Sequence, residues 1–251
     1  MHALAAIFSV LLVAPVALVR AETLTVSVAS SFRDVGAEVA KQFEAAHPGV
    51  TVSLNNGPSG MLARQIEDGA PVDVFVSAGW PEVERLTAKG LVADKPVVVA
   101  RNRLVVVVPK GSPWIGKDPR ALLESPDVAK IASGDPKTVP FGNYAKQALE
   151  AAGLWASLEP KMVFASEVRQ ALTYAEQRAV DAAIVYATDA RIAHDAVAVG
   201  EVPGASGLKI EVVAVRTARS TSEAAKAFLA ELTSEHARTS LLAAGFLAPG
   251  S

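Results

Sequence analysis

The stretch Ser27-Val28-Ala29-Ser30-Ser31-Phe32-Arg33-Asp34 joins an apolar run, Leu24–Val28, to a segment with helical spacing, Val35–Ala46. An apolar β-rich run followed directly by an amphipathic segment is typical of a strand that leads into a helix. Two hydroxyl side chains, Ser30 and Ser31, stand at this junction. Serine is a common helix N-cap, but its hydroxyl also donates hydrogen bonds to ligands, so both roles are open.

The same strand-to-helix succession repeats along the chain. Strands are predicted at Leu24–Val28, Val50–Leu54, Val72–Val76, Leu104–Val108, Met162–Phe164, Ala182–Tyr186 and Ile210–Val215. Helices are predicted at Val35–Ala46, Leu62–Asp68, Glu82–Ala88, Tyr144–Ala152, Val168–Gln177 and Ala190–His194, with two closing helices at Ser222–Leu232 and Glu235–Ala244. This alternation predicts an α/β protein whose sheets are mostly parallel.

One unusually long apolar run predicts two lobes. Val97–Val108 is long enough for two strands, or for one strand that leaves one lobe and enters another, and Ile210–Val215 is a plausible return. We therefore expect a first lobe of residues 22–104 and 213–251, a second lobe of residues 105–212, and a ligand cleft between them.

Composition restricts the classes of function. The 251 residues are 51% hydrophobic, which is enough for a sizeable core, and the formal net charge of −2 leaves no basic footprint for nucleic acid. The chain has no cysteine, which excludes disulfides, thiolate nucleophiles and zinc–cysteine sites.

The first residues predict export. Ala3–Val19 is apolar apart from Ser9, and Val19-Arg20-Ala21 fits the small-x-small rule for cleavage before Glu22, although no positive charge precedes the run. The alternative, a membrane anchor, is disfavoured because the run is short for a span and contains Pro15. We expect residues 1–21 to be a signal peptide and the mature protein to be soluble and periplasmic.

Several junctions between strands and helices carry Ser, Gly, Pro or Tyr. They are Ser30-Ser31, Asn55–Gly60, Gly134–Gly142, Ala165–Val168 and Tyr186–Asp189. Helix N-termini expose unpaired N–H groups and attract anions, and ligands of open α/β sheets bind at the carboxyl ends of strands. The pattern indicates an anion cleft. For each residue alone a structural role remains open: capping for Ser30, Ser31, Ser59 and Ser166, and packing for Tyr186.

Enzymatic motifs are incomplete. Gly111–Asp118 approaches a phosphate-binding loop, but Asp118 replaces the required hydroxyl and Pro113 removes one N–H. Gly57–Met61 approaches a nucleophile elbow, but Met61 stands where glycine is needed. The histidines show no paired metal-binding spacing, and Asp73 and Asp181 at strand starts are predicted to be structural. A secreted serine hydrolase using Ser59 remains a weak alternative.

An ordered set of segments from Leu24 to Phe246 resembles the periplasmic molybdate-binding proteins of ABC transporters, within the type II solute-binding superfamily. The segments are Thr25–Ser31, Ser59–Ile66, Gly69–Ala78, Leu104–Lys110, Gly134–Ala145, Glu167–Leu172 and Ile184–Ala190. The resemblance implies a two-lobe fold hinged by two crossover strands. It also implies a non-enzymatic receptor that delivers molybdate, and tungstate with it, to an inner-membrane permease, with no cofactor and no metal other than that in the oxyanion. A monomer is expected because the sequence shows no signal of an oligomer.

The resemblance further implies the ligand-binding positions: the hydroxyls of Ser31 and Ser59, the backbone N–H groups of Phe141 and Val168, and the Tyr186 hydroxyl. Ser30 competes with Ser31 because a shift of one residue exchanges them, and Gly60 is a secondary candidate beside Ser59. Phe141 departs from the small residue that is usual in the family, and its ring is expected to alter the cleft.

The chemistry of molybdate suits neutral donors. The dianion has four acceptor oxygens and no proton, so a pocket made only of donors fits it, whereas a protonated phosphate leaves a buried O–H unpaired at about 1–3 kcal/mol. Sulfate differs from molybdate mainly in size, so a sulfate or other oxyanion receptor is the main alternative. A receptor for iron, which tends to use paired tyrosines, or for an organic ligand is a further one.

Overall fold

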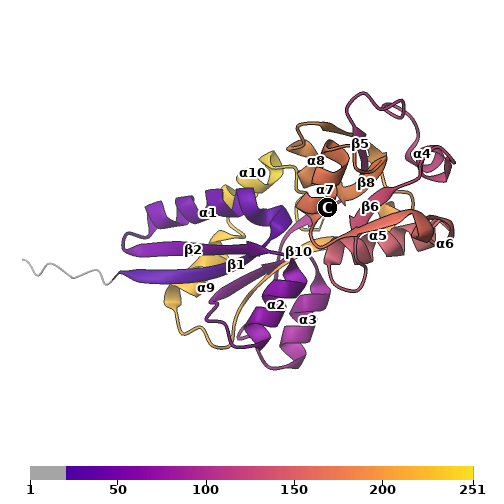
Figure 1. The fold of residues 1–251 in the computed structure, drawn as a ribbon. Coiled ribbons are helices and arrows are strands. Elements are labelled where there is room, and N and C mark those ends of the chain that lie inside the picture. The colour runs from indigo at the N-terminus through magenta and orange to yellow at the C-terminus, as the bar shows by residue number, and fades with distance from the viewer. Residues whose placement is uncertain (1–20, 251) are drawn as a thin grey trace, which may run out of the picture.

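The computed structural model describes residues 21–250. The predicted signal peptide, apart from Ala21, therefore lies outside the described residues. The described chain forms two lobes that lie side by side, each built on a five-stranded sheet flanked by helices (Figure 1). Within the described residues, no helix is long and apolar enough to cross a membrane.

The first lobe holds the sheet β2-β1-β3-β10-β4, in which β10 alone runs against the other strands. Its strands are β1 (Glu22–Ala29), β2 (Val50–Gly57), β3 (Val74–Ser77), β4 (Val97–Asn102) and β10 (Ile210–Arg216). Its helices are α1 (Arg33–Ala46), α2 (Ser59–Glu67), α3 (Trp80–Ala88), α9 (Glu223–Glu231) and α10 (Glu235–Ala243), and a 3-10 turn, η1 (Ser30–Phe32), precedes α1.

The second lobe repeats this plan with the sheet β7-β6-β8-β5-β9, in which β5 alone is reversed. Its strands are β5 (Leu104–Pro109), β6 (Ile131–Gly134), β7 (Met162–Ala165), β8 (Ala182–Tyr186) and β9 (Ala196–Glu201). Its helices are α4 (Pro119–Glu124), α5 (Pro140–Ala151), α6 (Trp155–Leu158), α7 (Val168–Glu176) and α8 (Ala187–Arg191), with 3-10 turns η2 (Glu159–Lys161) and η3 (Ala205–Gly207).

The chain crosses between the lobes twice. The long apolar run divides at Arg103 into β4 of the first sheet and β5 of the second, and the chain returns between β9 and β10. Asn102 at the end of β4 donates from Nδ2 to Thr188 Oγ1 of α8 at 3.0 Å, and both side chains are buried. The crossover is therefore tied to both lobes.

The first-lobe sheet is covered on both faces because its strands alternate. Val74 and Val76 of β3 belong to the core formed with α1, α9 and α10, whereas Phe75 between them belongs to the core formed with α2 and α3. Phe43 of α1 is fully buried and meets Phe228 of α9 edge-on at 5.1 Å. Burying a side chain of this size contributes about 1.5–3 kcal/mol.

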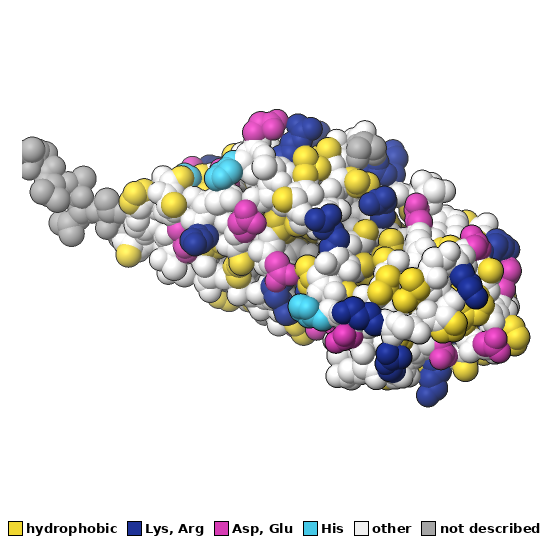
Figure 2. Space-filling model, turned by 90° about the horizontal axis from the view of Figure 1, so that it is seen from above, with side chains coloured by type: hydrophobic (Ala, Val, Ile, Leu, Met, Phe, Trp, Pro, Cys, Tyr) yellow, Lys and Arg dark blue, Asp and Glu magenta, His cyan; other side chains and the backbone are white. Residues whose placement is uncertain are grey.

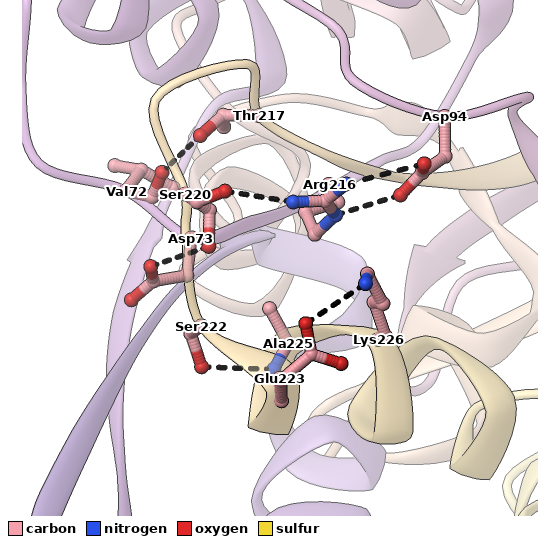
Figure 3. Close-up of polar contacts among 10 residues, drawn as sticks. All are labelled: Val72, Asp73, Asp94, Arg216, Thr217, Ser220, Ser222, Glu223, Ala225 and Lys226. Atoms are coloured by element: carbon pink, nitrogen blue, oxygen red, sulfur yellow. Dashed lines mark hydrogen bonds and ion pairs between the residues drawn. The ribbon is translucent and has the colours of Figure 1, made fainter.

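The chain that returns through β10 is fastened to the first lobe (Figure 3). Arg216 contacts Asp94 with an Nε–Oδ2 distance of 2.7 Å and donates to the Ser220 carbonyl at 2.7 Å. Ser220 donates to Asp73 Oδ1 at 2.7 Å, and Asp73 Oδ2 accepts from the Thr25 N–H at 2.9 Å. The structural role predicted for Asp73 is confirmed.

Helix caps occur at three helices of the described chain. Asp118 accepts from the Ala121 N–H at α4, Ser222 from the Ala225 N–H at α9, and Ser234 from the Ala237 N–H at α10. The near-match to a phosphate-binding loop is thus a turn that leads to a capped helix, because Asp118 uses its carboxylate on α4.

Candidate anion-binding site

The carboxyl ends of strands from both sheets meet at one interlobe cavity of about 260 Å³ of empty space. Its lining consists of Ala29, Ser30, Ser31, Pro58, Ser59, Ala78, Val139, Pro140, Phe141, Glu167, Val168 and Tyr186. This volume includes space that is open to solvent. All five positions implied by the family resemblance lie in this lining, and so does Ser30.

Gly60 lies outside the cavity. It borders a larger outer hollow of about 1000 Å³ of empty space, which also includes Pro58, Val139 and Glu167. A Cβ added at Gly60 would stand 2.4 Å from the Thr138 carbonyl oxygen of the second lobe. Gly60 therefore permits close contact between the lobes.

Helices that start at the cavity have no side-chain caps. The N-cap residues of α2, α5 and α7 are Pro58, Val139 and Glu167, and none accepts a hydrogen bond from its helix. The capping role considered for Ser30, Ser31 and Ser59 is therefore wrong, because Ser59 is the first residue of α2 and neither Ser30 nor Ser31 caps η1 or α1. First-turn N–H groups without acceptors attract an anion, as does the helix dipole.

The two candidate serines of the first junction differ in their partners. Ser30 Oγ donates to Glu167 Oε2 across the lobes at 2.5 Å, which uses its single proton. The Ser31 side chain, also buried, makes no hydrogen bond to another described residue. The proton of Ser31 is therefore available to a guest in the cavity.

Ala78, at the end of β3, connects the other two hydroxyls of the cavity. Its N–H donates to Ser59 Oγ at 3.1 Å, so the Ser59 hydroxyl proton stays free to donate. Its carbonyl accepts from the Tyr186 hydroxyl at 3.4 Å, a long and weak contact. Sequence reasoning assigned no role to Ala78, although its place directly after a parallel strand is the signal that selects such residues.

Tyr186 is a neutral donor. Its side chain is buried at the end of β8, and this burial raises the pKa of Tyr186 well above its usual range. The phenol therefore keeps its proton at any physiological pH and can donate it to an acceptor oxygen.

Phe141 lies in the first turn of α5 and is 2% exposed. Its ring stands 6.1 Å from that of Tyr186 and packs on Gly134, where a Cβ would come within 2.7 Å of the Phe141 ring. The bulky side chain is thus accommodated by a glycine at the end of β6.

The cavity is not lined by donors alone, contrary to the sequence prediction. Glu167, the residue before α7, brings the one carboxylate of the lining described for this cavity. No lysine, arginine or histidine of the described chain lines the cavity. Because Ser30 already donates to Glu167, one acceptor position of the Glu167 carboxylate is occupied.

The remaining residues weighed in the sequence lie elsewhere. Ser166 is exposed and donates from Oγ to Gln170 Oε1 at 3.0 Å. Asp181 accepts from the N–H groups of Ala129 and Lys130, which confirms its structural role. Of the tyrosines, Tyr144 and Tyr174 do not line the cavity. No group of three or more His, Cys, Asp or Glu side chains positioned to hold a metal ion occurs in residues 21–250.

Known proteins resemble this chain over most of its length. It is 39% identical over 171 residues to YvgL of Bacillus subtilis, a protein named as a substrate-binding lipoprotein of an ABC transporter, and the match covers 68% of this chain and 65% of that protein. It is 32% identical over 238 residues to the molybdate-binding protein ModA of Haemophilus influenzae, covering 90% of each.

A solved structure agrees with these relatives. The periplasmic molybdate-binding protein of Azotobacter vinelandii superposes with a TM-score of 0.75 at 26% identity, covering 90% of this chain and 99% of that chain. This match confirms the predicted two-lobe type II fold. The model of the bacterial extracellular solute-binding proteins matches residues 24–247. The chain therefore belongs to the bacterial extracellular solute-binding protein family, whose members bind their solutes rather than convert them.

Proposed function

We propose that this protein captures molybdate, and tungstate with it, in the interlobe cavity and delivers it to an ABC permease of the inner membrane. The names of the H. influenzae and A. vinelandii relatives support the molybdate ligand, and the name of the B. subtilis relative supports the ABC transporter as partner. In this proposal the protein is exported, cleaved before Glu22 and active as a periplasmic monomer. Its two moving lobes are residues 22–104 with 213–251, and residues 105–212, with the boundaries inside the crossover segments that contain β5 and β10.

The observation that carries the proposal is the set of donors around one cavity, of which only the Tyr186 hydroxyl has a described acceptor, in the long contact with the Ala78 carbonyl. The first lobe contributes the hydroxyls of Ser31 and Ser59, and the second contributes the first turns of α5 and α7, at Phe141 and Val168, and the Tyr186 hydroxyl. Donors from both lobes around one guest favour a closed arrangement when the guest is bound. A dianion with four acceptor oxygens is the guest that satisfies them.

The surface is consistent with a small anionic ligand bound inside. Basic and acidic side chains are interspersed on the face in Figure 2, with no broad patch of one sign on that face. Attraction for the anion is then local and comes from hydrogen bonds and helix dipoles in the cavity.

Glu167 gives the cavity an acceptor that a protonated phosphate could use. A protonated phosphate brings an O–H that needs an acceptor, and a carboxylate is available at the cavity lining. Exclusion of phosphate in this proposal rests on Ser30, whose hydroxyl already binds that carboxylate.

Sulfate is the second candidate ligand because the same donors fit any tetrahedral dianion. The hydrolase alternative has little support: Ser59 accepts from the Ala78 N–H, and no histidine of the described residues lines the cavity to serve as its base. The iron alternative is disfavoured because Tyr186 is the one tyrosine in the described lining.

Calorimetric titration of the mature protein with molybdate, tungstate, sulfate and phosphate tests the proposal. We expect binding of molybdate and tungstate with similar affinity, and weaker or no binding of the other two. Binding of sulfate or phosphate alone would contradict the ligand assignment and leave the family assignment intact.

A further inference from the structure

The residues before and after Val168, which begins α7, both contact the first lobe. Glu167 accepts from Ser30 Oγ at 2.5 Å, and Arg169 Nη2 contacts Asp34 Oδ2 at 2.7 Å. Ser30 and Asp34 flank the turn that carries Ser31, and α7 packs against that turn (Figure 1). Two side-chain contacts therefore join the segments on which a proposed hydroxyl donor and a proposed N–H donor lie.

Arg169 is held in place from within its own lobe. Its Nε lies 2.5 Å from Oδ1 of Asp189, whose side chain is completely buried at the start of α8. The geometry of this contact does not meet the criteria for a hydrogen bond. Neither oxygen of the Asp189 side chain has a hydrogen-bond partner in the described chain. The contact with Asp189 holds the Nε edge of the guanidinium, while Nη2 reaches Asp34, so Asp189 orients Arg169 toward the first lobe.

The contact between Ser30 and Glu167 lies at the mouth of the cavity. Both residues line the inner cavity, and Glu167 also lines the outer hollow beside Pro58 and Val139. Gly60 and Thr138 border the same outer hollow, and a Cβ at Gly60 would stand 2.4 Å from the Thr138 carbonyl oxygen. A Cβ at Gly79 would stand 3.1 Å from the Tyr144 hydroxyl and 3.2 Å from the Pro140 Cβ, which are also close contacts. The lobes thus touch through glycines of the first lobe as well as through the polar side chains of Ser30 and Glu167.

We infer that Glu167 and Arg169 form a clasp that joins Ser30 and Asp34 when the lobes close, and that this clasp slows the escape of the bound anion. The inference rests on the proposed function for the identity of that anion. Glu167, Arg169 and Asp189 act as positioning residues: they hold the Val168 turn against the Ser31 turn. The contacts form only after the lobes meet, so they affect release more than capture.

Asp34→Asn tests the clasp, and Asp94→Asn is its matched control. Both variants remove an aspartate–arginine contact of 2.7 Å, but Asp94 and Arg216 lie in the same lobe (Figure 3). Release and capture of molybdate are followed by stopped-flow fluorescence. We expect Asp34→Asn to raise the release rate about two- to five-fold, the range for a partly exposed ion pair, with the capture rate unchanged. Asp94→Asn should leave both rates unchanged.

An unchanged release rate in Asp34→Asn, or an equal increase in Asp94→Asn, would overturn the clasp. Asp34→Glu keeps the charge and should restore slow release. At the other contact, Glu167→Gln keeps an acceptor oxygen for Ser30 and should release molybdate more slowly than Glu167→Ala. Equal release rates of these two variants would contradict the role of that hydrogen bond.

A failure of the proposed function is distinguishable from a failure of the clasp. If the wild-type protein binds no molybdate, the proposed function is wrong, and the clasp is tested without ligand by small-angle X-ray scattering. The Asp34→Asn protein is then expected to show a larger radius of gyration than the wild type and the Asp94→Asn control. Identical radii for the three proteins would overturn the clasp.

Discussion

At the scale of single residues, the proposed anion binding depends on which serine hydroxyl protons are free to donate. Ser30 and Ser31 are adjacent, and the sequence left them as competitors because a one-residue shift exchanges them. Their difference comes from Glu167, which lies 137 residues away and binds Ser30. No local pattern carries that information, because the contact exists only after both lobes have folded and met.

Ser31→Ala and Ser59→Ala test the two hydroxyl donors. Each variant leaves an oxygen of a desolvated anion without a donor, which costs about 1–3 kcal/mol, or about 5- to 150-fold in affinity. Calorimetry with molybdate measures the change. Ser166→Ala is the control, because that exposed serine binds Gln170 and does not line the cavity. Wild-type affinity in both cavity variants would refute the assignment.

Gly60→Ala tests whether close contact between the lobes is needed for binding, independently of the stability of the ligand-free protein. Alanine favours a helix over glycine by about 1 kcal/mol, so the ligand-free protein should not melt at a lower temperature. The new Cβ would stand 2.4 Å from the Thr138 carbonyl, so the lobes cannot meet as they do here. We expect at least tenfold weaker molybdate binding with a melting temperature that is not lowered. Unchanged affinity would show that this close contact is not needed for binding.

At the scale of elements, the sequence predicted most strands and helices but placed several helix starts too late. α2 begins at Ser59 rather than Leu62, α5 at Pro140 rather than Tyr144, and α8 at Ala187 rather than Ala190. These first turns face the cavity or the crossover, so they lack the apolar spacing that a core-facing helix shows. The helix starts that the sequence placed too late thus lie in the interlobe region.

Two strands were missed for a different reason. β6 (Ile131–Gly134) and β9 (Ala196–Glu201) contain alanine, serine and glycine where β-branched residues are expected. β6 lies inside its sheet between β7 and β8 and is fully buried, so tertiary packing decides its conformation. Gly134 at its end also makes room for Phe141, a relation that no single segment of the sequence reveals.

Capped and uncapped helices should respond differently to mutation. Ser222→Ala removes the cap of α9 and should lower the free energy of unfolding by about 1 kcal/mol. α9 lies in the first-lobe core and does not line the cavity, so molybdate affinity should not change. Urea denaturation and calorimetry on the same protein provide the two measurements. A loss of molybdate affinity in Ser222→Ala would contradict the statement that α9 takes no part in the binding site.

The pairing of α7 with α8 predicts a pH dependence of stability. Burial raises the pKa of Asp189 to about 7 from an unfolded value of 3.8, against the lowering effect of Arg169. The folded protein then holds a proton that the unfolded chain has already released, so the stability from this group is complete below the unfolded pKa. It is lost as the pH rises toward the folded pKa.

Asp189→Asn does not titrate at this position, so the wild type should lose stability relative to it between pH 5 and 7. The loss is up to about 1.4 kcal/mol per pH unit. Urea denaturation of both proteins across this range measures the difference. Parallel stability curves for the two proteins would contradict the raised pKa.

At the scale of the whole molecule, the two-lobe plan followed from the divided apolar run at residues 97–108 and from the family resemblance, and the structure confirms it. What the sequence could not supply is the relation between the lobes. The close approach of Gly60 to Thr138 and the contacts of Glu167 and Arg169 join residues far apart in the chain. They hold the two lobes together around the cavity, which residues of both lobes line.

Diffraction from crystals grown with molybdate, recorded at the molybdenum absorption edge, tests the central claim most directly. The account predicts one strong anomalous peak in the interlobe cavity, within hydrogen-bond reach of the Ser31, Ser59 and Tyr186 hydroxyls and of the Phe141 and Val168 N–H groups. A peak outside this cavity, or an anion held there by lysine or arginine side chains, would contradict it.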